Sequence, residues 1–325
     1  MPAFDAEATL ALALRSVQRQ TLRNWECVLV DDGSRDRTRA IAEDFASRDP
    51  RLRVVSVPHG GIVAALQAGI AAFAPLIARF DADDLMSRRR LAVQQLALQR
   101  AADLAAVGCH VRLFPRAHLR AGRLAYERWL ASIATAEDVG IEAFVECPIA
   151  HPSLMIRRAV LVELGYRDRG WPEDYDLILR LLEAGHRLAV VPERLLHWRD
   201  SATRLSRTSH DYAIPAFVQC KAEFLARGFL ANTPSYVLWG YGDTGKALAD
   251  ALAQRDKHPA AIIELHPRRL GQLIRGVRVV PPSALPDLPR LPLVVSVAGL
   301  TPRTEIRQAL CGMGFREPSD YVCAA

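Results

Sequence analysis

The sequence lacks the features of a membrane-spanning or secreted protein. It contains no uninterrupted apolar stretch of about 18 residues, so it offers no transmembrane helix. Its first residues carry no positive side chain and include Asp5 and Glu7, so we expect no signal peptide. Its six cysteines are scattered without a CxxC pair, which argues against a disulfide framework or a zinc site. These absences predict a cytoplasmic protein with free thiols.

Lysine is almost absent. Among 42 basic residues only Lys221, Lys246 and Lys257 are lysines, and the rest are arginines, whose planar fork suits phosphate binding. The net charge of +6 is divided between residues 1–230 and 231–325 and is not concentrated in either part. It is compatible with a weak attraction to phosphate-bearing substrates or to a membrane surface, and nucleic acid is not needed to explain it. The sequence leaves open whether the chain forms a homo-oligomer.

The order of predicted elements is that of an α/β protein. Short β-branched runs at 25–30, 52–57 and 76–80 are separated by amphipathic helical stretches. At 325 residues and 50% hydrophobic composition, the chain is about twice a usual single-domain length, so we expect two domains. A new strand, glycine-rich turn and helix begin at Tyr236, which places the predicted boundary at residue 231.

Two acidic turns follow predicted strands, at Asp31-Asp32 and at Asp81-Ala-Asp83-Asp84. In open α/β sheets, ligands bind at the carboxyl ends of the strands. Crowded carboxylates repel one another, so a cation or helix N-terminal N–H groups usually offset them. Mg²⁺ or Mn²⁺ with a phosphate-bearing partner would suit these hard oxygen ligands. Helix capping by the same aspartates is the alternative, and the spacing alone does not decide between the two.

Five motifs in one order resemble the family 2 glycosyltransferases, which have a GT-A fold. They are PAFDAEATLALALRSVQRQTLRNWECVLVDDGSRDRT, HGGIVAALQAG, ARFDADDLMSRRRL, PIAHPSLMIRR and WPEDYDLILRLLEAG. The resemblance covers residues 1 to about 208 and implies a GT-A domain over 1–230. It also implies transfer of a sugar from a nucleotide-diphospho-sugar to a hydroxyl of a saccharide or lipid-linked acceptor. The transfer would invert the anomeric carbon and serve polysaccharide or glycoconjugate synthesis.

The resemblance assigns donor-site residues. Those that would surround the nucleotide base and ribose are Pro2, Ala3, Glu7 and Asp32. Asp81 and Asp83 match the family's DxD motif: Asp83 would ligate Mg²⁺ or Mn²⁺, and Asp81 would face the ribose or the sugar. A divalent cation at this position would neutralise the charge that develops on the nucleoside diphosphate leaving group.

The acid pair Glu173-Asp174 matches the family's ED motif, which supplies the general base. Asp174 would take the proton from the acceptor hydroxyl, and Glu173 is the second choice. Asp176 would project toward a different face, because helical side chains two residues apart do not share one. The alternative is a helix N-terminus whose acids complement the helix dipole.

A basic, hydroxyl-rich segment, 197–208, follows a strand predicted over 186–192. Related enzymes carry a mobile lid over the donor phosphates here, so the resemblance places His197 and Arg199 on the donor phosphates, followed by Arg204 and Arg207. Guanidinium groups bind phosphate bidentately. A solvated basic loop is the alternative. In the preceding motif, His151 resembles a position on the acceptor side, and a structural role is its alternative.

The chain departs from the family pattern in three places. The first strand, which normally precedes the segment beginning at Met1-Pro2, is not present, and its loss would expose apolar surface and unpaired backbone groups. Asp5 replaces the usual Asn, and Arg88 stands where Pro is common. A degenerate, non-catalytic scaffold is therefore the alternative function, although the intact DxD and ED motifs count against it. A nucleotidyltransferase would need a Gly-rich basic loop near the N-terminus, which the DDGSRDRT turn is not.

In residues 231–325, Gly240-x-Gly242-x-x-Gly245 follows a strand and opens a helix, and Glu264 ends the next strand. This is the arrangement of a dinucleotide-binding fingerprint, in which the glycines admit a pyrophosphate and the acid holds a ribose. The segment resembles the small Rossmann-like domains of sugar-modifying acyltransferases and some dehydrogenase-like proteins. No acid–base pair for hydride transfer is apparent beside it in the sequence. We therefore expect either a regulatory site for NAD or another nucleotide, or a structural or dimerising unit.

Overall fold

The computed structural model of the chain describes residues 1–70, 73–201 and 204–325. Its contacts divide the chain into two compact units, each with its own hydrophobic core. The segments of the first unit are Met1–Val139, Pro148–Arg169 and Glu173–Arg204, and those of the second are Gly140–Cys147, Gly170–Pro172 and Leu205–Ala325. Part of the basic segment 197–208 therefore lies outside the described residues.

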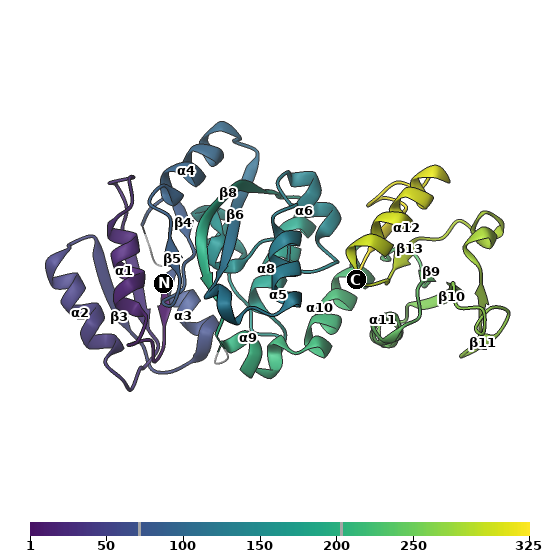
Figure 1. The fold of residues 1–325 in the computed structure, drawn as a ribbon, viewed down its shortest axis with the longest axis horizontal. Coiled ribbons are helices and arrows are strands. Elements are labelled where there is room, and N and C mark those ends of the chain that lie inside the picture. The colour runs from purple at the N-terminus through teal and green to yellow at the C-terminus, as the bar shows by residue number, and fades with distance from the viewer. Residues whose placement is uncertain (71–72, 202–203) are drawn as a thin grey trace. The chain divides into compact units, whose positions relative to one another are not determined.

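A parallel three-stranded sheet begins the first unit. Its strands, in spatial order, are β1 (Pro2–Ala3), β2 (Cys27–Asp31) and β3 (Leu52–Ser56). The helices that follow them in the chain are α1 (Leu10–Gln18), α2 (Thr38–Arg48) and α3 (Gly61–Gly69). The apolar stripe of α1, with Leu10 and Leu14, packs with Leu29 of β2. Figure 1 shows α1 and α2 side by side at this sheet, and the predicted order of strands and helices is confirmed here.

The first residues of the chain join this sheet. The Met1 ammonium donates to the Val28 carbonyl at 2.9 Å, and the Val30 N–H donates to the Met1 carbonyl at 2.8 Å. Pro2–Ala3 therefore form the short strand β1, which pairs with β2. Asp5 follows with φ 45°, a left-handed conformation that both Asp and Asn tolerate, so the replacement of the usual Asn keeps this turn.

A mixed five-stranded sheet completes the first unit. Its strands, in the spatial order β4-β7-β6-β8-β5, are β4 (Leu76–Ala78), β7 (Met155–Arg157), β6 (Leu104–Phe114), β8 (Arg187–Arg199) and β5 (Leu85–Met86). β6 and β8 are parallel, and the other neighbours are antiparallel. Its helices are α4 (Arg90–Arg100), α5 (Ala121–Leu130), α7 (Arg158–Leu164) and α8 (Glu173–Glu183), and α6 (Ala136–Glu142) spans both units.

The strand β8 is longer than predicted, which corrects the interpretation of residues 197–199. We expected a strand over 186–192 and a loop from His197, but β8 continues to Arg199. Its register with β6 shifts at Pro192-Glu193, which form a bulge. Proline cannot donate to a sheet and ends the strand pattern in the sequence, whereas the bulge lets the pairing resume. His197 and Arg199 therefore lie in a strand, and their part in donor binding stays a prediction.

The second unit contains a six-stranded sheet. Its strands, in the spatial order β11-β12-β10-β9-β13-β14, are β11 (Leu273–Ile274), β12 (Val277–Val280), β10 (His258–Ile263), β9 (Ser235–Trp239), β13 (Leu293–Val295) and β14 (Tyr321–Cys323). Apart from the antiparallel pair β11 and β12, all neighbours are parallel. The helices of this unit are α9 (Leu205–Thr208), α10 (Ile214–Arg227), α11 (Asp243–Ala253) and α12 (Leu300–Gly312).

Helices cover both faces of this sheet. In β9, Tyr236 and Leu238 belong to a core shared with α10 and α11, whereas Val237 and Trp239 belong to a core shared with α12. Such alternation on a strand that is buried from Tyr236 to Trp239 is typical of parallel sheets, whose crossover helices pack on both sides.

Within the described ranges, no helix has both the length and the apolar composition needed to cross a bilayer.

The helix α10 lies before residue 231 in the chain but belongs to the second compact unit. The division of function at residue 231 stays a prediction.

Candidate active site

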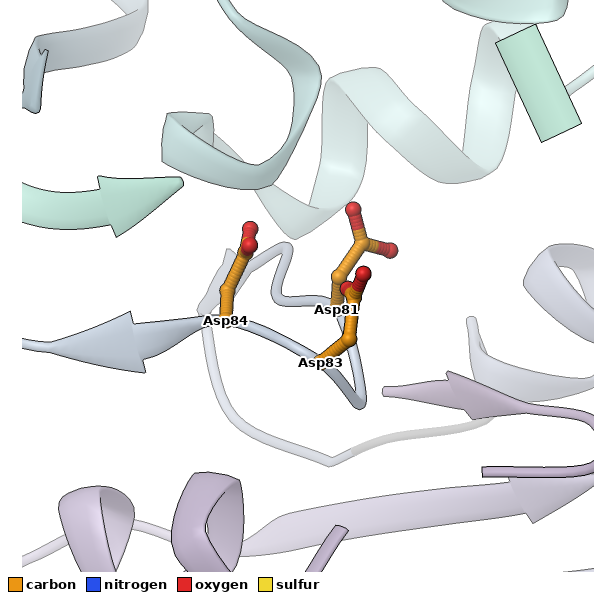
Figure 2. Close-up of side chains that lie close together, drawn as sticks. All are labelled: Asp81, Asp83 and Asp84. Carbon is orange, nitrogen blue, oxygen red and sulfur yellow. The ribbon is translucent and has the colours of Figure 1, made fainter. Parts of the chain in front are cut away.

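The acidic turn after β4 brings three carboxylates together. One oxygen each of Asp81, Asp83 and Asp84 lies within 4.8 Å of the others, and Figure 2 shows all three side chains pointing to the same side of the turn. The turn follows β4 in the chain and leads directly into β5, so strands fix both of its ends. The predicted DxD pair is thus part of a three-carboxylate cluster.

Burial and mutual repulsion shift the pKa values of these carboxyl groups. Burial, and then the charge of Asp81, raises the pKa of Asp83 to about 6. The same causes, with Asp83 added, raise the pKa of Asp84 well above its ordinary value. Burial acts to raise the pKa of Asp81, but the Arg79 guanidinium, together with His151 and Arg204, lowers it below its ordinary value. The cluster therefore holds one stabilised carboxylate and two that resist ionisation without a further positive charge.

Arg79 is the cation that holds Asp81. Its side chain is 8% exposed, and its guanidinium forms an ion pair with the Asp81 carboxylate. Arg79 comes two residues before Asp81, a spacing that places side chains on the same side of an extended chain. That spacing is the signal that sequence reasoning missed.

The end of β8 clamps the acidic turn. The Arg199 N–H donates to Asp84 Oδ1 at 2.7 Å, and Arg199 Nε donates to the Asp83 carbonyl at 2.7 Å. Its guanidinium lies 4.5 Å from the ring centroid of Phe114. His197, two residues earlier, is exposed and packs edge-on against the same ring at 6.3 Å. The contacts of Arg199 are therefore made with the acidic turn itself.

The other acidic pair stands at the first turn of α8. Glu173 is 4% exposed, and its Oε1 lies 3.6 Å from Nδ1 of His151, whose Nε2 is 2.9 Å from the Tyr166 hydroxyl. Asp174 Oδ1 accepts the N–H of Tyr175 at 2.7 Å. Burial, and then the charge of Glu173, raises the pKa of Asp174 to about 7.

Asp176 belongs to the packing of α8. Its carboxylate accepts from Arg180 Nε at 2.6 Å, and both side chains are buried. The other guanidinium nitrogens of Arg180 donate to the carbonyls of Leu164 and Gly165 at 2.8 and 2.7 Å. This agrees with the expectation that Asp176 projects away from the face of Asp174.

Asp32, one of the residues predicted to bind the donor, holds a glycine turn. It is 3% exposed, and its two oxygens accept the N–H groups of Gly60 and Gly61 at 2.9 and 3.0 Å, at the N-terminus of α3. Nδ1 of His59 lies 2.9 Å from Asp32 Oδ2, and the ring of Phe4 stacks on His59 with centroids 4.2 Å apart. Sequence reasoning missed this exposed aromatic pair beside Asp32, although both residues lie in the motifs that carry the resemblance.

The remaining predicted donor residues lie in the same first segment. Pro2 and Ala3 are buried in β1, beside the end of β2 that Asp32 follows. Glu7 is exposed, and its Oε2 accepts the Arg37 N–H at 3.0 Å. The described structure thus brings the N-terminal segment and the VDDGS turn together, and Glu7 lies at the start of α2.

In the second unit, each glycine of the fingerprint has a different environment. Gly240 has φ 95°, and a Cβ there would lie 2.9 Å from the Ser296 carbonyl oxygen. A Cβ on Gly245 would lie 2.1 Å from the Gly240 carbonyl oxygen, so this position admits no side chain. A Cβ on Gly242 would meet no described atom within 4 Å. Glu264 follows β10, and its Oε2 accepts from Arg269 Nη1 at 3.0 Å.

The chain is similar in sequence to proteins of one known family. Residues 1–165 match the family described as Glycosyl transferase family 2. The chain is 30% identical over 221 residues to EpsE of Bacillus subtilis (strain 168), which is named as a glycosyltransferase. The match covers 66% of this chain and 76% of EpsE. The amylovoran biosynthesis glycosyltransferase AmsE of Erwinia amylovora is 26% identical over 235 residues, or 70% of this chain and 86% of AmsE.

The fold has solved relatives as well. A crystal structure of S. aureus TarS in complex with UDP-GlcNAc superposes with a TM-score of 0.56 at 15% sequence identity, over 78% of this chain and 70% of that chain. At this identity the likeness concerns the fold. Together with the family match over residues 1–165, it identifies the chain as a glycosyltransferase that belongs to glycosyl transferase family 2.

Proposed function

We propose that this glycosyltransferase moves a sugar from a nucleotide-diphospho-sugar donor to a hydroxyl group of a saccharide or lipid-linked acceptor. Inversion at the anomeric carbon, with a carboxylate base and a divalent cation, is part of the proposal. The name of AmsE and the UDP-GlcNAc bound to TarS support polysaccharide or glycoconjugate synthesis with a nucleotide-sugar as the process and donor class.

One observation carries the proposal: one oxygen each of Asp81, Asp83 and Asp84 lies within 4.8 Å of the others on the turn after β4. The charge of Asp81 on this turn and the charges of the acid pair of α8 also reach one buried group, the hydroxyl of Tyr166. Burial raises the pKa of Tyr166, Arg79 lowers it, and the negative charges of Glu173, Asp174 and Asp81 raise it further. A candidate cation site and a candidate base therefore share one electrostatic neighbourhood, as a transfer between a diphosphate donor and a hydroxyl acceptor requires.

The residues present fit a divalent cation. Asp84 is fully buried, and within the described chain its Oδ2 has no hydrogen-bond partner. Asp83 and Asp84 both resist ionisation without added positive charge. Asp83, helped by Asp84, would hold Mg²⁺ or Mn²⁺, hard cations that prefer carboxylate oxygens. Such an ion would stabilise the charge that develops on the departing diphosphate.

Asp174 is the proposed base, and Glu173 its neighbour is second. A pKa of about 7 leaves Asp174 partly ionised near neutral pH, which suits proton removal from a hydroxyl. Glu173 is buried against His151 and is less free to reach an acceptor. The proton would pass from the acceptor hydroxyl to Asp174 as that oxygen attacks the anomeric carbon and the diphosphate leaves from the opposite face.

The donor pocket is proposed around the first segment. Its residues are Pro2, Ala3, Glu7, Asp32, Asp81, His197 and Arg199. Asp32 would act mainly through the glycine turn that it holds, and the exposed Phe4–His59 stack beside it offers an aromatic face to a nucleotide base. Arg199 would contribute by fixing the acidic turn, and His197 by its exposure on β8.

For residues 231–325 we propose a Rossmann-like domain. Numbered along the chain, its parallel strands β12, β10, β9, β13 and β14 have the spatial order 3-2-1-4-5. That order is the one found in doubly wound dinucleotide-binding sheets.

The test of the transferase proposal is a turnover assay with UDP-, GDP- and dTDP-sugars, with Mn²⁺ and with EDTA. We expect product from one donor class, only with the metal, and with inverted anomeric configuration by NMR. Asp83→Ala should abolish turnover, whereas Asp44→Asn, on the exposed face of α2, should not. Turnover that needs neither metal nor Asp83, or a retained configuration, contradicts the mechanism.

A further inference from the structure

We propose that the second unit holds a nucleotide site of its own, which binds the ribonucleoside 5′-diphosphate part of a ligand at the glycine turn between β9 and α11. The site consists only of residues of the second unit, so it goes beyond the transferase function. A helix N-terminus alone would not define a site, and the argument rests on four further features.

The first feature is that the three glycines differ in backbone conformation and in the space available for a side chain. Gly240 makes the positive-φ turn at the end of β9, and Gly245 lets α11 approach that turn more closely than any side chain would allow. Gly242 has neither constraint: its φ is −75°, and its Cβ direction is open. The open side of the turn is therefore where an external group can reach the backbone N–H groups of α11.

The second feature is the place of the turn in the sheet. β9 lies between β10 and β13, so the chain moves outward from it in both directions. The carboxyl ends of β9 and β13 lead into the N-termini of α11 and α12, and Gly299, with φ 102°, precedes the latter helix. Two helix N-termini with partial positive charge thus follow adjacent strands at the switch point, where ligands of such sheets bind.

The third feature is an unpartnered hydroxyl. Ser296, directly after β13, is 3% exposed, and no hydrogen-bond partner for its Oγ exists among the described residues. Its Cβ lies 3.5 Å from the Cβ position of Gly245, and its carbonyl adjoins Gly240, so Ser296 packs against the glycine turn. A buried hydroxyl without a partner is costly, and a phosphate oxygen would satisfy it.

The fourth feature is a carboxylate held in place near the same turn. Glu264 Oε2 accepts from Arg269 Nη1 at 3.0 Å, and the same nitrogen donates to the Tyr241 carbonyl at 2.8 Å, within the glycine turn. Glu264 Oε1 accepts the Leu265 N–H at 2.9 Å. An acid fixed after the second strand is the group that holds a ribose diol, so the ligand class is a ribonucleoside diphosphate.

The first experiment counts nucleotide bound per full-length chain by equilibrium dialysis, with ADP, NAD⁺, UDP and GDP as separate probes. Gly242→Asp places a carboxylate in the open space at the N-cap of α11, where Asp is favourable for the helix, so the melting temperature should not fall. Binding of the preferred probe to this variant should weaken at least about tenfold by charge repulsion. Gly312→Asp, at a similarly open position of the same unit, is the matched control.

The probes also distinguish the ligand sources. Preference for NAD⁺ and ADP would identify an adenine dinucleotide, and preference for UDP or GDP would identify the nucleoside diphosphate of a sugar donor. Loss of 2′-hydroxyl selectivity in Glu264→Gln, measured with 2′-deoxy analogues, would support the ribose contact. The proposal is overturned if no probe binds with an affinity that Gly242→Asp weakens, or if Gly312→Asp weakens it equally.

Ser296→Ala is the second experiment, and it separates binding from structure. Because the hydroxyl has no partner in the protein, its removal should leave the ligand-free melting temperature unchanged or higher. The affinity for the bound nucleotide should fall about three- to tenfold, as for one lost hydrogen bond. A lower melting temperature with unchanged affinity would assign Ser296 a structural role and contradict its part in the site.

Discussion

Nδ1 of His151 lies 3.6 Å from Oε1 of Glu173, and both side chains are almost fully buried. The contact ties the histidine of one sequence motif to the first acid of another, and the Tyr166 hydroxyl secures the opposite ring nitrogen at 2.9 Å. Of the two acids at the start of α8, Glu173 is therefore in contact with His151, whereas Asp174 has the raised pKa.

This difference predicts unequal effects of removing the two acids. Asp174→Asn should lower kcat about 10²- to 10⁴-fold, the range of one general base. Glu173→Gln should have the smaller effect, because Glu173 would act through the position of its neighbour. The measurement is single-turnover sugar transfer with each variant. A larger loss for Glu173→Gln would transfer the role of base to Glu173.

The raised pKa of Asp174 also predicts a pH profile. Activity should fall as the pH decreases through about 7, because protonation removes the base. Folding stability should change in the opposite direction. Between the usual pKa of 3.8 and the folded value of about 7, the folded state keeps a proton that the unfolded state has lost, so stability declines as the pH rises through this window.

Asp174→Asn gives the control for that profile. The variant should be more stable than the wild type at pH 8 and show a weaker pH dependence of its melting temperature between pH 5 and 8. An unchanged profile would mean that other groups dominate the stability in this window.

Metal binding should stabilise the protein through the acidic turn. Mn²⁺ at about 100 times its dissociation constant should add about 2.7 kcal/mol to the free energy of unfolding. Asp83→Asn and Asp84→Asn should both reduce this gain, and Asp44→Asn should not. The check is the melting temperature as a function of Mn²⁺ concentration, reversed by EDTA. Equal gains in all variants would show that the ion binds elsewhere.

Removing the cation beside Asp81 should be costly. Arg79→Met leaves the Asp81 carboxylate without its buried partner, and we expect a loss of about 3 kcal/mol in the free energy of unfolding. The double variant Arg79→Met/Asp81→Asn should recover part of that loss. Urea denaturation of the two variants measures both effects. A cost for Arg79→Met that Asp81→Asn does not relieve would contradict the pairing.

The sequence predicts secondary structure best where apolar residues recur at a regular spacing along the whole element. The helical stretch predicted between the strand runs 25–30 and 52–57 is present as α2 (Thr38–Arg48), because its apolar positions recur at helical spacing. The continuation of β8 was hidden by Pro192-Glu193, which belong to a bulge defined only by the partner strand β6. β14, with three residues, was missed because a run this short is defined by its pairing with β13 and not by a pattern of its own.

The sequence predicts the acidic residues of the candidate site better than it predicts the basic residue beside them. Asp83 and Asp174 stand in recognisable motifs, and both have raised pKa values in the structure. Arg79 was counted as part of a strand, since its burial beside Asp81 depends on packing that one sequence does not display. His151 and Tyr166 are 15 residues apart in the chain, and no sequence pattern predicts that their side chains are in contact.

The bonds from Arg199 to the acidic turn have a consequence for how this enzyme forms. The Arg199 N–H and the carboxylate of Asp84 are 115 positions apart along the chain. Closing so large a loop is slow compared with local folding, and the N-terminal sheet contains only nearer pairings. During synthesis, the acidic turn therefore lacks its clamp until the ribosome has passed β8, and the nascent chain can be folded around its first sheet well before it is competent for catalysis.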